Sequence, residues 1–492
     1  MRKSRCPAHC HGHGLSRRAF LGTGACLLGS AVVAGCGGAA ATTANPTPGA
    51  ALTRLKPCGP ASTITPTLRA AFVRRKGEYG MRWPGAVYDG EAARARYAAL
   101  VQDQAGRLGM KLDLRPEPIH SNKEADAWVA EAKAAGPDGL LVVLLDRQEH
   151  AWPTARRAID TGLPTVVYSP LGTSFTTNTV GLAERPNSVI YATDDTTQLV
   201  YGMKMLHARA KMRAARCVVL RGKNRKDVPL ADLGTSLRYV PAADFLAEYQ
   251  KTPTDAEIEA IADSYIRRAT RMTGPTRDDV LGGVKSYVVA RKILEREGGD
   301  AISMDCLGAL GKSKVSLPCI AWSRMNDEGV PAACEADTGA IATHMAVQYL
   351  FDRPGFQQDP VPETARKAII GAHCTCATRL DGFDQAPEPY HLQHHHGNRD
   401  AVPVPTWRIG QPVTSADILP GKPSKMLIAA GRVVENVKVP PSGGCVVSVM
   451  VEFDDTKNVL TWPGFHQIWF YGDYKDDLAD FCKLTGIETV MA

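Results

Sequence analysis

The sequence has no strong excess of charge of either sign. Its 492 residues carry a formal net charge of +7, and the lysines and arginines are scattered along the chain. Two short basic clusters, at residues 74–76 and 221–226, are typical of a solvated surface rather than of a nucleic-acid footprint. We therefore expect no nucleic-acid partner.

Glycine-rich phosphate loops are also missing. The glycines that follow apolar segments, as in Arg221-Gly-Lys-Asn224 and Leu281-Gly-Gly283, lack the spacing of a nucleotide-binding fingerprint. The sequence therefore predicts neither a dinucleotide nor a nucleoside triphosphate as a ligand.

Long hydrophobic runs are absent as well, and the apolar run at residues 19–35 is too short and too rich in glycine and alanine to span a membrane well. It follows Ser16-Arg-Arg-Ala-Phe-Leu21, a twin-arginine export motif, and ends in Val33-Ala-Gly-Cys36, which has the form of a lipoprotein signal-peptidase box. We expect export to the periplasm or cell surface and a lipid anchor on Cys36. A plain cleaved signal or a misjudged start codon are the alternatives.

Cysteine usage is consistent with export but does not define a disulfide framework. Removal of residues 1–35 takes three of the thirteen cysteines, and lipidation of Cys36 leaves an odd number, so at least one is free or pairs between chains. We interpret four of the others as small core residues because their neighbours are apolar: Cys217, Cys306, Cys319 and Cys334.

What the sequence does contain is a regular alternation of apolar strands and helices. The pattern predicts strands near residues 70–73, 111–114, 139–145, 164–168 and 189–192, with helices at 90–108, 122–135, 151–161 and 195–213. Uniformly apolar strands that alternate with helices are typical of parallel, doubly wound sheets. From about residue 371 the alternation of strands and helices gives way to short strands, which we expect at 406–409, 426–433 and 445–453.

This pattern predicts an α/β protein with five segments. They are a signal peptide (1–36), a flexible linker rich in glycine, alanine, threonine and proline (37–65), an α/β domain (66–213), a second α/β domain (214–370) and a β-rich domain (371–492).

The most informative stretch is residues 318–340. It reads as a short helix, a break at 326–329, a buried strand at 330–334 and a second helix from about 340 to 350. Glu335 and Asp337 follow the strand, and open α/β sheets place ligands at the carboxyl ends of their strands. We expect Asp337 to bond the N-terminus of the second helix.

The sequence of this stretch resembles that of the L-fucose/L-arabinose isomerase family. Cys334-Glu-Ala-Asp337 stands where the family has a Cys-Glu-Gly-Asp-like or Ala-Glu-Gly-Asp-like turn, and Asp359 follows Glu335 by 24 residues. His373 ends the apolar segment Ala368-Ile-Ile-Gly-Ala, and His466 ends Trp462-Pro-Gly-Phe, ahead of a helix and a last strand. The resemblance covers roughly residues 66–492 and is firmest from 300 onward.

The resemblance implies a fold, a cofactor and a reaction. The fold would be two Rossmann-like domains followed by a barrel-like domain, in a protein that forms homo-oligomers. The cofactor would be a divalent metal held by Glu335, Asp359 and His466. His373 would be either a fourth ligand or a residue that donates a hydrogen bond to one of the ligands. Carboxylates with imidazoles suit Mn²⁺. The reaction would be aldose–ketose isomerisation of a monosaccharide through an enediol, with Glu335 and Asp359 as acid and base.

Other residues are weaker candidates. The tract His394-His-His396, with Asn398 and Arg399, would bind a metal or meet the sugar, and Trp83 with Arg82 would close the pocket of a neighbouring subunit. Cys374 and Cys376 would pack, bind a metal or pair, and we favour packing.

Two other functions are compatible with the sequence. The chain could be an exported, lipid-tethered carbohydrate-binding protein of the same fold without turnover; the set Glu335, Asp359 and His466 argues against this. It could be a twin-arginine redox enzyme; the lack of a nucleotide or iron–sulfur motif argues against that.

Overall fold

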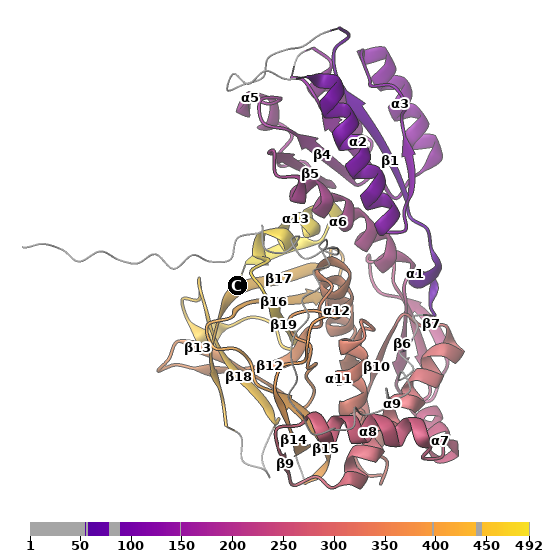
Figure 1. Ribbon diagram of the computed structural model, residues 1–492, viewed down its shortest axis with the longest axis vertical. Helices are drawn as coiled ribbons and strands as arrows, with labels where there is room; N and C mark the ends of the chain where they lie inside the picture. Colours follow the sequence, from indigo (N-terminus) through magenta and orange to yellow (C-terminus); the bar gives the residue numbers. More distant parts are fainter. Residues whose placement is uncertain are drawn as a thin grey trace, which may run out of the picture. The chain divides into compact units, whose positions relative to one another are not determined.

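The computed structural model describes residues 55, 58–77, 89–147, 149–395, 398–438 and 445–491 (Figure 1). The predicted signal peptide with Cys36, and also Arg82, Trp83 and His396, lie outside the described residues. Within the described part of the chain, no helix is both long enough and apolar enough to cross a membrane.

The first sheet is parallel throughout, with the strand order β2-β1-β3-β4-β5 of one class of doubly wound sheets. Every residue of β3 is buried, which explains its uniformly apolar sequence. The strands are β1 (Thr67–Val73), β2 (Lys111–Leu114), β3 (Gly139–Leu144), β4 (Thr165–Ser169) and β5 (Ser188–Ala192). The helices between them are α2 (Gly90–Arg107), α3 (Asn122–Ala135), α4 (Ala151–Ile159) and the short α5 (Thr176–Thr179).

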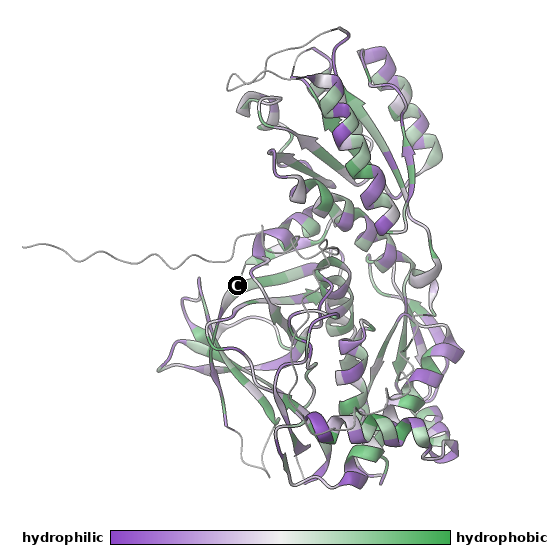
Figure 2. Ribbon diagram, in the orientation of Figure 1, coloured by the Kyte–Doolittle hydropathy of each residue, from purple (hydrophilic) through white to green (hydrophobic). Residues whose placement is uncertain are grey.

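Local sequence signals account for the ends of these helices. The side chain of Ser121 accepts a hydrogen bond from the backbone N–H of Glu124 at the start of α3, and Gly136 ends that helix with a φ of 59°. In Figure 2 β4 of this sheet is mainly hydrophobic in colour, whereas α2 and α3 alternate between both colours, as amphipathic helices do.

The second sheet has the order β11-β10-β6-β8-β7, with β7 as an antiparallel edge. Its strands are β6 (Arg216–Leu220), β7 (Lys226–Pro229), β8 (Ser236–Val240), β10 (Ala301–Met304) and β11 (Ala332–Cys334). Its helices are α6 (Thr196–Ala214), α7 (Ala242–Lys251), α8 (Ala256–Arg268), α9 (Arg277–Glu297), α10 (Cys306–Leu310), α11 (Cys319–Asp327) and α12 (Thr338–Phe351).

Six antiparallel strands of the described residues close into a barrel in the order β16-β19-β12-β13-β18-β17, because β16 also pairs with β17. Gly371 of β13 is required by packing, since a Cβ there would lie 2.6 Å from the ring of Trp469. The strands are β12 (Phe356–Glu363), β13 (Ala368–His373), β16 (Pro412–Leu419), β17 (Lys425–Asn436), β18 (Val447–Phe453) and β19 (Gln467–Tyr471).

Smaller elements complete the fold. A three-stranded sheet has the order β15-β14-β9, and β20 adds to β17 in parallel. Their bounds, with the remaining helices, are β9 (Met272–Thr273), β14 (Tyr390–His395), β15 (Arg399–Pro405), β20 (Glu488–Met491), α1 (Pro60–Thr63), α13 (Lys475–Thr485) and the 3₁₀ turn η2 (Val459–Thr461).

The predicted α/β class with a β-rich part is therefore confirmed at this level, and three details differ. The predicted linker 37–65 contains α1, which is anchored by hydrogen bonds from Ala61 and Ser62 to the carboxylate of Asp300. The barrel begins at β12, before residue 371. Residues 406–409 are not a strand, because the Trp407 backbone bonds the side chain of Asn436 instead of a neighbouring strand.

Candidate functional site

Three neighbouring barrel strands bring three of the predicted site residues to one place. β12 lies between β13 and β19. Asp359 of β12 faces Ala372, the residue before His373, and Gln358 faces Gln467, the residue after His466. The register of these two pairings therefore places Asp359, His373 and His466 side by side although they span more than a hundred residues of sequence.

The fourth residue, Glu335, belongs to the second sheet's part of the chain. It follows β11, the strand whose carboxyl end was predicted to carry a ligand. Glu335 and Ala336 have φ values of 64° and 54°, so two consecutive left-handed residues turn the chain toward α12. The backbone N–H of Cys334 donates to Oε1 of Gln357 over 2.8 Å, which ties this turn to β12.

The four side chains converge on a common space. Nε2 of His466 lies 3.3 Å from Oδ1 of Asp359 and 3.4 Å from Oε2 of Glu335, and Nε2 of His373 lies 3.7 Å from Oε1 of Glu335. One ligand atom each of Glu335, His373 and His466 lies within 4.8 Å of the other two. We call Glu335, Asp359, His373 and His466 the carboxylate–histidine cluster.

Three buried polar atoms of this cluster have ion-pair neighbours at 3.3–3.7 Å but no well-aligned hydrogen bond to a described residue. Among the described residues, Oδ1 of Asp359, Nε2 of His373 and Nε2 of His466 are buried without a hydrogen-bond partner. Buried polar atoms are nearly always satisfied, and an ion is one common reason for an exception. Two carboxylates and two imidazoles with unsatisfied atoms aimed together fit a divalent cation.

The electrostatics of the cluster also favour a positive charge at its centre. Burial lowers the pKa of His466, but its hydrogen bond to Asp337 and the contacts with Asp359 and Glu335 outweigh burial and raise that pKa to about 11. Burial raises the pKa of Asp337, but His466 and the backbone N–H groups of Ala340 and Gly339 together outweigh burial, so the net shift of this pKa is downward. A cation held between these carboxylates would experience the same attraction.

Asp337 has two roles, of which the sequence predicted one. Its Oδ1 accepts a hydrogen bond from the backbone N–H of Ala340 over 2.8 Å and so caps α12, as expected. Its Oδ2 lies 2.8 Å from Nδ1 of His466. A carboxylate at Nδ1 fixes the tautomer that leaves Nε2 free to bind a metal. The Asp at the fourth position of the turn Cys334-Glu-Ala-Asp337 was the available signal for this role.

Asp337→Asn is expected to lower the affinity for a divalent cation by about 10–100-fold, the usual cost of losing a carboxylate behind a histidine ligand. The amide nitrogen opposes Nδ1–H and favours the tautomer with its proton on Nε2. Titration of Mn²⁺ into purified protein measures the effect. Asp255→Asn is the matched control because Asp255 caps α8 through Ile258. Equal affinities in both variants would contradict the role of Asp337.

A further carboxylate that the sequence did not single out lies beside this pair. Asp417 of β16 is buried, and burial together with the charge of Asp337 raises its pKa to about 6. Asp417 therefore changes charge near neutral pH next to the cap of α12.

The weaker candidates have other surroundings. The guanidinium of Arg399 donates to the backbone carbonyls of Gly311 and Val315 and to Asp400, so it fastens the loop after α10. Asn398 is exposed in a turn with a φ of 55°. Trp83 and His396 lie outside the described residues, so their predicted contacts with a sugar stay predictions.

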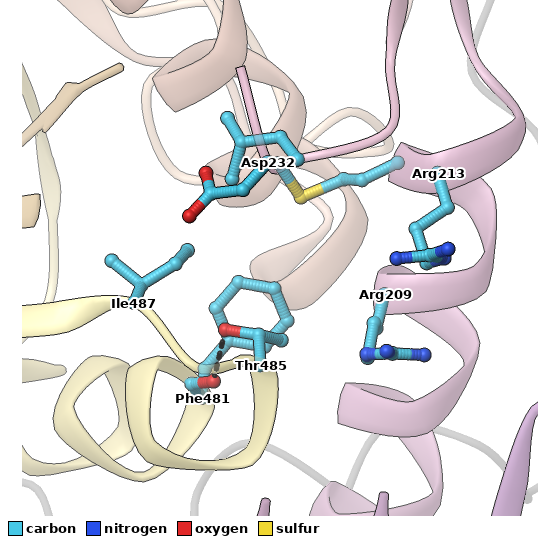
Figure 3. A pocket seen from close by; sticks show the side chains of 8 residues that line it. Arg209, Arg213, Asp232, Phe481, Thr485 and Ile487 are labelled. Atoms are coloured by element: carbon cyan, nitrogen blue, oxygen red, sulfur yellow. Dashed lines mark hydrogen bonds between the residues drawn. The ribbon is translucent and has the colours of Figure 1, made fainter. Parts of the chain in front are cut away.

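A separate pocket lies among α6, α13 and the segment between β7 and β8 that contains Asp232 and Leu233 (Figure 3). The guanidinium groups of Arg209 and Arg213 extend side by side from α6, and Phe481, Thr485 and Ile487 lie opposite them. Its lining residues are different from those of the carboxylate–histidine cluster, so the pocket is not part of that site.

Comparison with known proteins does not identify a family. No protein-family model and no curated protein matches the chain. Solved structures give weak similarities. The XylFII molecule has 12% identity and a TM-score of 0.18, covering 49% of this chain and 79% of that one. A periplasmic solute-binding protein from Actinobacillus succinogenes with bound D-allose has 12% identity and a TM-score of 0.17, covering 49% and 78%. A sugar-binding protein from Bacillus halodurans has 14% identity and a TM-score of 0.17, covering 61% and 91%. These TM-scores are too low to support an argument about function.

Proposed function

We propose that this protein is a metal-dependent aldose–ketose isomerase. The observation that carries the proposal is the convergence of Asp359, His373 and His466 on the carboxylate of Glu335. Their N···O separations are 3.3–3.7 Å, and Oδ1 of Asp359 and Nε2 of both histidines are buried without a well-aligned hydrogen bond to a described residue. Buried polar atoms without a well-aligned hydrogen bond are uncommon, and a bound ion is one explanation for them.

Glu335, Asp359 and His466 would hold the cation, with His373 as the fourth ligand. Oxygen and imidazole donors suit Mn²⁺ better than zinc, which takes thiolates readily. When bound, a divalent cation supplies the charge that holds two adjacent sugar oxygens and stabilises the negative charge that develops on them.

The two carboxylates are suited to the proton transfers. The side chain of Glu335 is 40% exposed and that of Asp359 is 28% exposed, so a sugar can reach both, whereas the two imidazoles are buried. One carboxylate takes the proton from C2 of the aldose as the C2–H bond breaks, and O1 gains a proton to give the enediol. The proton is then delivered to C1 while O2 loses its proton, which gives the ketose.

We extend the proposal to the arrangement of the chain. Each parallel sheet would be the centre of a Rossmann-like domain, and the barrel would close over the cation. The enzyme would work as an exported, lipid-anchored homo-oligomer on a monosaccharide. The twin-arginine motif and Cys36 support export, and the position of the cluster at the carboxyl end of β11 supports the domain arrangement.

Elemental analysis of the purified protein, together with a panel of aldoses read by ketose formation, tests the proposal. We expect a hard divalent ion and conversion of at least one aldose in its presence, with loss of conversion after chelation and recovery with Mn²⁺. Tight binding of a sugar without conversion would contradict the isomerase and favour an exported carbohydrate-binding protein.

A further inference from the structure

A second group of ligand atoms lies next to the carboxylate–histidine cluster, on the side where Cys374 follows His373. The sulfurs of Cys319 and Cys374 and one ring nitrogen of His395 lie within 4.8 Å of one another. The sulfurs of Cys334 and Cys374 form a second such group with a ring nitrogen of His373. Cys374 belongs to both groups. We call Cys319, Cys334, Cys374 and His395 the thiol cluster.

The thiol cluster is assembled from four separate parts of the chain. Cys319 is the first residue of α11, Cys334 is the last of β11, Cys374 directly follows β13, and His395 is the last of β14. Their exposed fractions are 2%, 3%, 8% and 2%, so all four are buried.

Ordinary packing does not explain this gathering well. A buried free cysteine usually serves as a small apolar residue, as Cys217 does within β6. In the thiol cluster the sulfurs instead approach one another and imidazole nitrogens, and Nδ1 of His373 lies 3.5 Å from Sγ of Cys374. All nine cysteines of the described residues are free, so no disulfide accounts for these approaches.

The donor atoms indicate which ligand the cluster would take. Thiolates and imidazole are the ligands of zinc sites, whereas the neighbouring cluster offers two carboxylates, two imidazoles and no thiolate. Zn–S bonds of about 2.3 Å in a tetrahedron separate two sulfurs by roughly 3.8 Å. The sulfur of Cys374 lies within 4.8 Å of that of Cys319 in one group and within 4.8 Å of that of Cys334 in the other, so both pairs are compatible with this separation. Three cysteines and one histidine are a known structural zinc set.

We propose that Cys319, Cys374 and His395, with Cys334 as the fourth ligand, form a binding site for a thiophilic divalent cation of the zinc class. The site goes beyond the proposed isomerase activity and does not depend on it. It lies next to His373, whose Nε2 points at Glu335 and whose Nδ1 points at Cys374. A cation there would fix the position of this shared imidazole at the edge of the carboxylate–histidine cluster.

The test is a metal analysis of the full chain purified without chelators. We expect one zinc per chain, and after replacement by Co²⁺ a thiolate-to-cobalt charge-transfer absorption in the near ultraviolet. Cys319→Ser and Cys374→Ser should lose the zinc and the absorption, whereas Cys482→Ser, at a buried cysteine of α13 outside the cluster, should keep both. Asp359→Asn should keep the zinc while losing affinity for Mn²⁺, which separates this site from the neighbouring one.

Three results would overturn the proposal. They are the absence of any sulfur–cobalt absorption in the wild type, full retention of zinc in folded Cys319→Ser and Cys374→Ser, and a disulfide that joins Cys374 to Cys319 or Cys334 in the mass spectrum of unreduced protein. The first and third measurements use the wild type, so they decide the question even where a variant fails to fold.

Discussion

Glu335→Gln is expected to lower the conversion of aldose to ketose by roughly 10²–10⁴-fold, the usual contribution of one positioned acid or base. The amide keeps the volume of the side chain and one oxygen that faces the histidines, so the cation stays partly bound. It cannot accept the proton from the sugar carbon. The loss should therefore appear in kcat rather than in folding or in sugar binding, which steady-state kinetics with circular dichroism and a binding isotherm will separate.

The matched control is Glu363→Gln, which makes the same chemical change at the far end of β12, where Glu363 faces Ala368. We expect this control to retain near wild-type turnover. If Glu335→Gln were as active as the control while folded and loaded with metal, Glu335 would not be the proton-transfer group.

Asp300→Ala is expected to lower the free energy of unfolding by about 3–5 kcal/mol, because each orphaned buried donor costs about 1–3 kcal/mol. The Asp300 side chain is 3% exposed and accepts hydrogen bonds from the backbone N–H groups of Ala61, Ser62 and Arg216 over 2.9–3.1 Å. It also accepts from Oγ of Ser62. The carboxylate thus joins α1 to the start of β6.

Urea denaturation followed by circular dichroism measures this effect. Asp278→Ala is the matched control, since Asp278 is an exposed residue in the first turn of α9 and its loss should change stability by no more than about 0.5 kcal/mol. Unfolding midpoints that coincide for the two variants would show that the contact of α1 with Asp300 does not stabilise the fold.

The first α/β unit could be predicted closely from the sequence because its signals are local. Helix α3 begins and ends at the residues that Ser121 and Gly136 indicate, and the apolar segment expected at 139–145 is the buried strand β3. Periodicity and capping depend on near neighbours in the chain, so these elements needed no information about distant residues.

The barrel was harder to predict because its strands are specified by partners far away in sequence. β12 contains two prolines, which are uncommon inside strands, yet it pairs with both β13 and β19. The segment 406–409 was expected to be a strand, but its backbone bonds the side chain of Asn436 and the hydroxyl of Tyr471 instead. Long-range pairing overrides local propensity in both cases.

The candidate site also has features that local sequence patterns predicted and features that depend on long-range contacts. A motif-based resemblance pointed to Glu335, Asp359, His373 and His466, and the structure brings these four together. The bond from Asp337 to His466 and the approach of Cys319, Cys334 and Cys374 were not predicted. Both depend on contacts between the end of β11 and the barrel, and the Asp of the turn signals a second role without identifying His466 as its partner.

The most direct test of the central claim is isomerisation in D₂O by wild-type protein loaded with Mn²⁺. The account predicts that the ketose formed from a converted aldose carries solvent deuterium, at least in part, at the carbon that receives the proton, because a carboxylate that has taken the proton exchanges it with solvent. It also predicts that Glu335→Gln forms no labelled product. Binding of the aldose by metal-loaded wild type with neither ketose nor label formed would contradict the account.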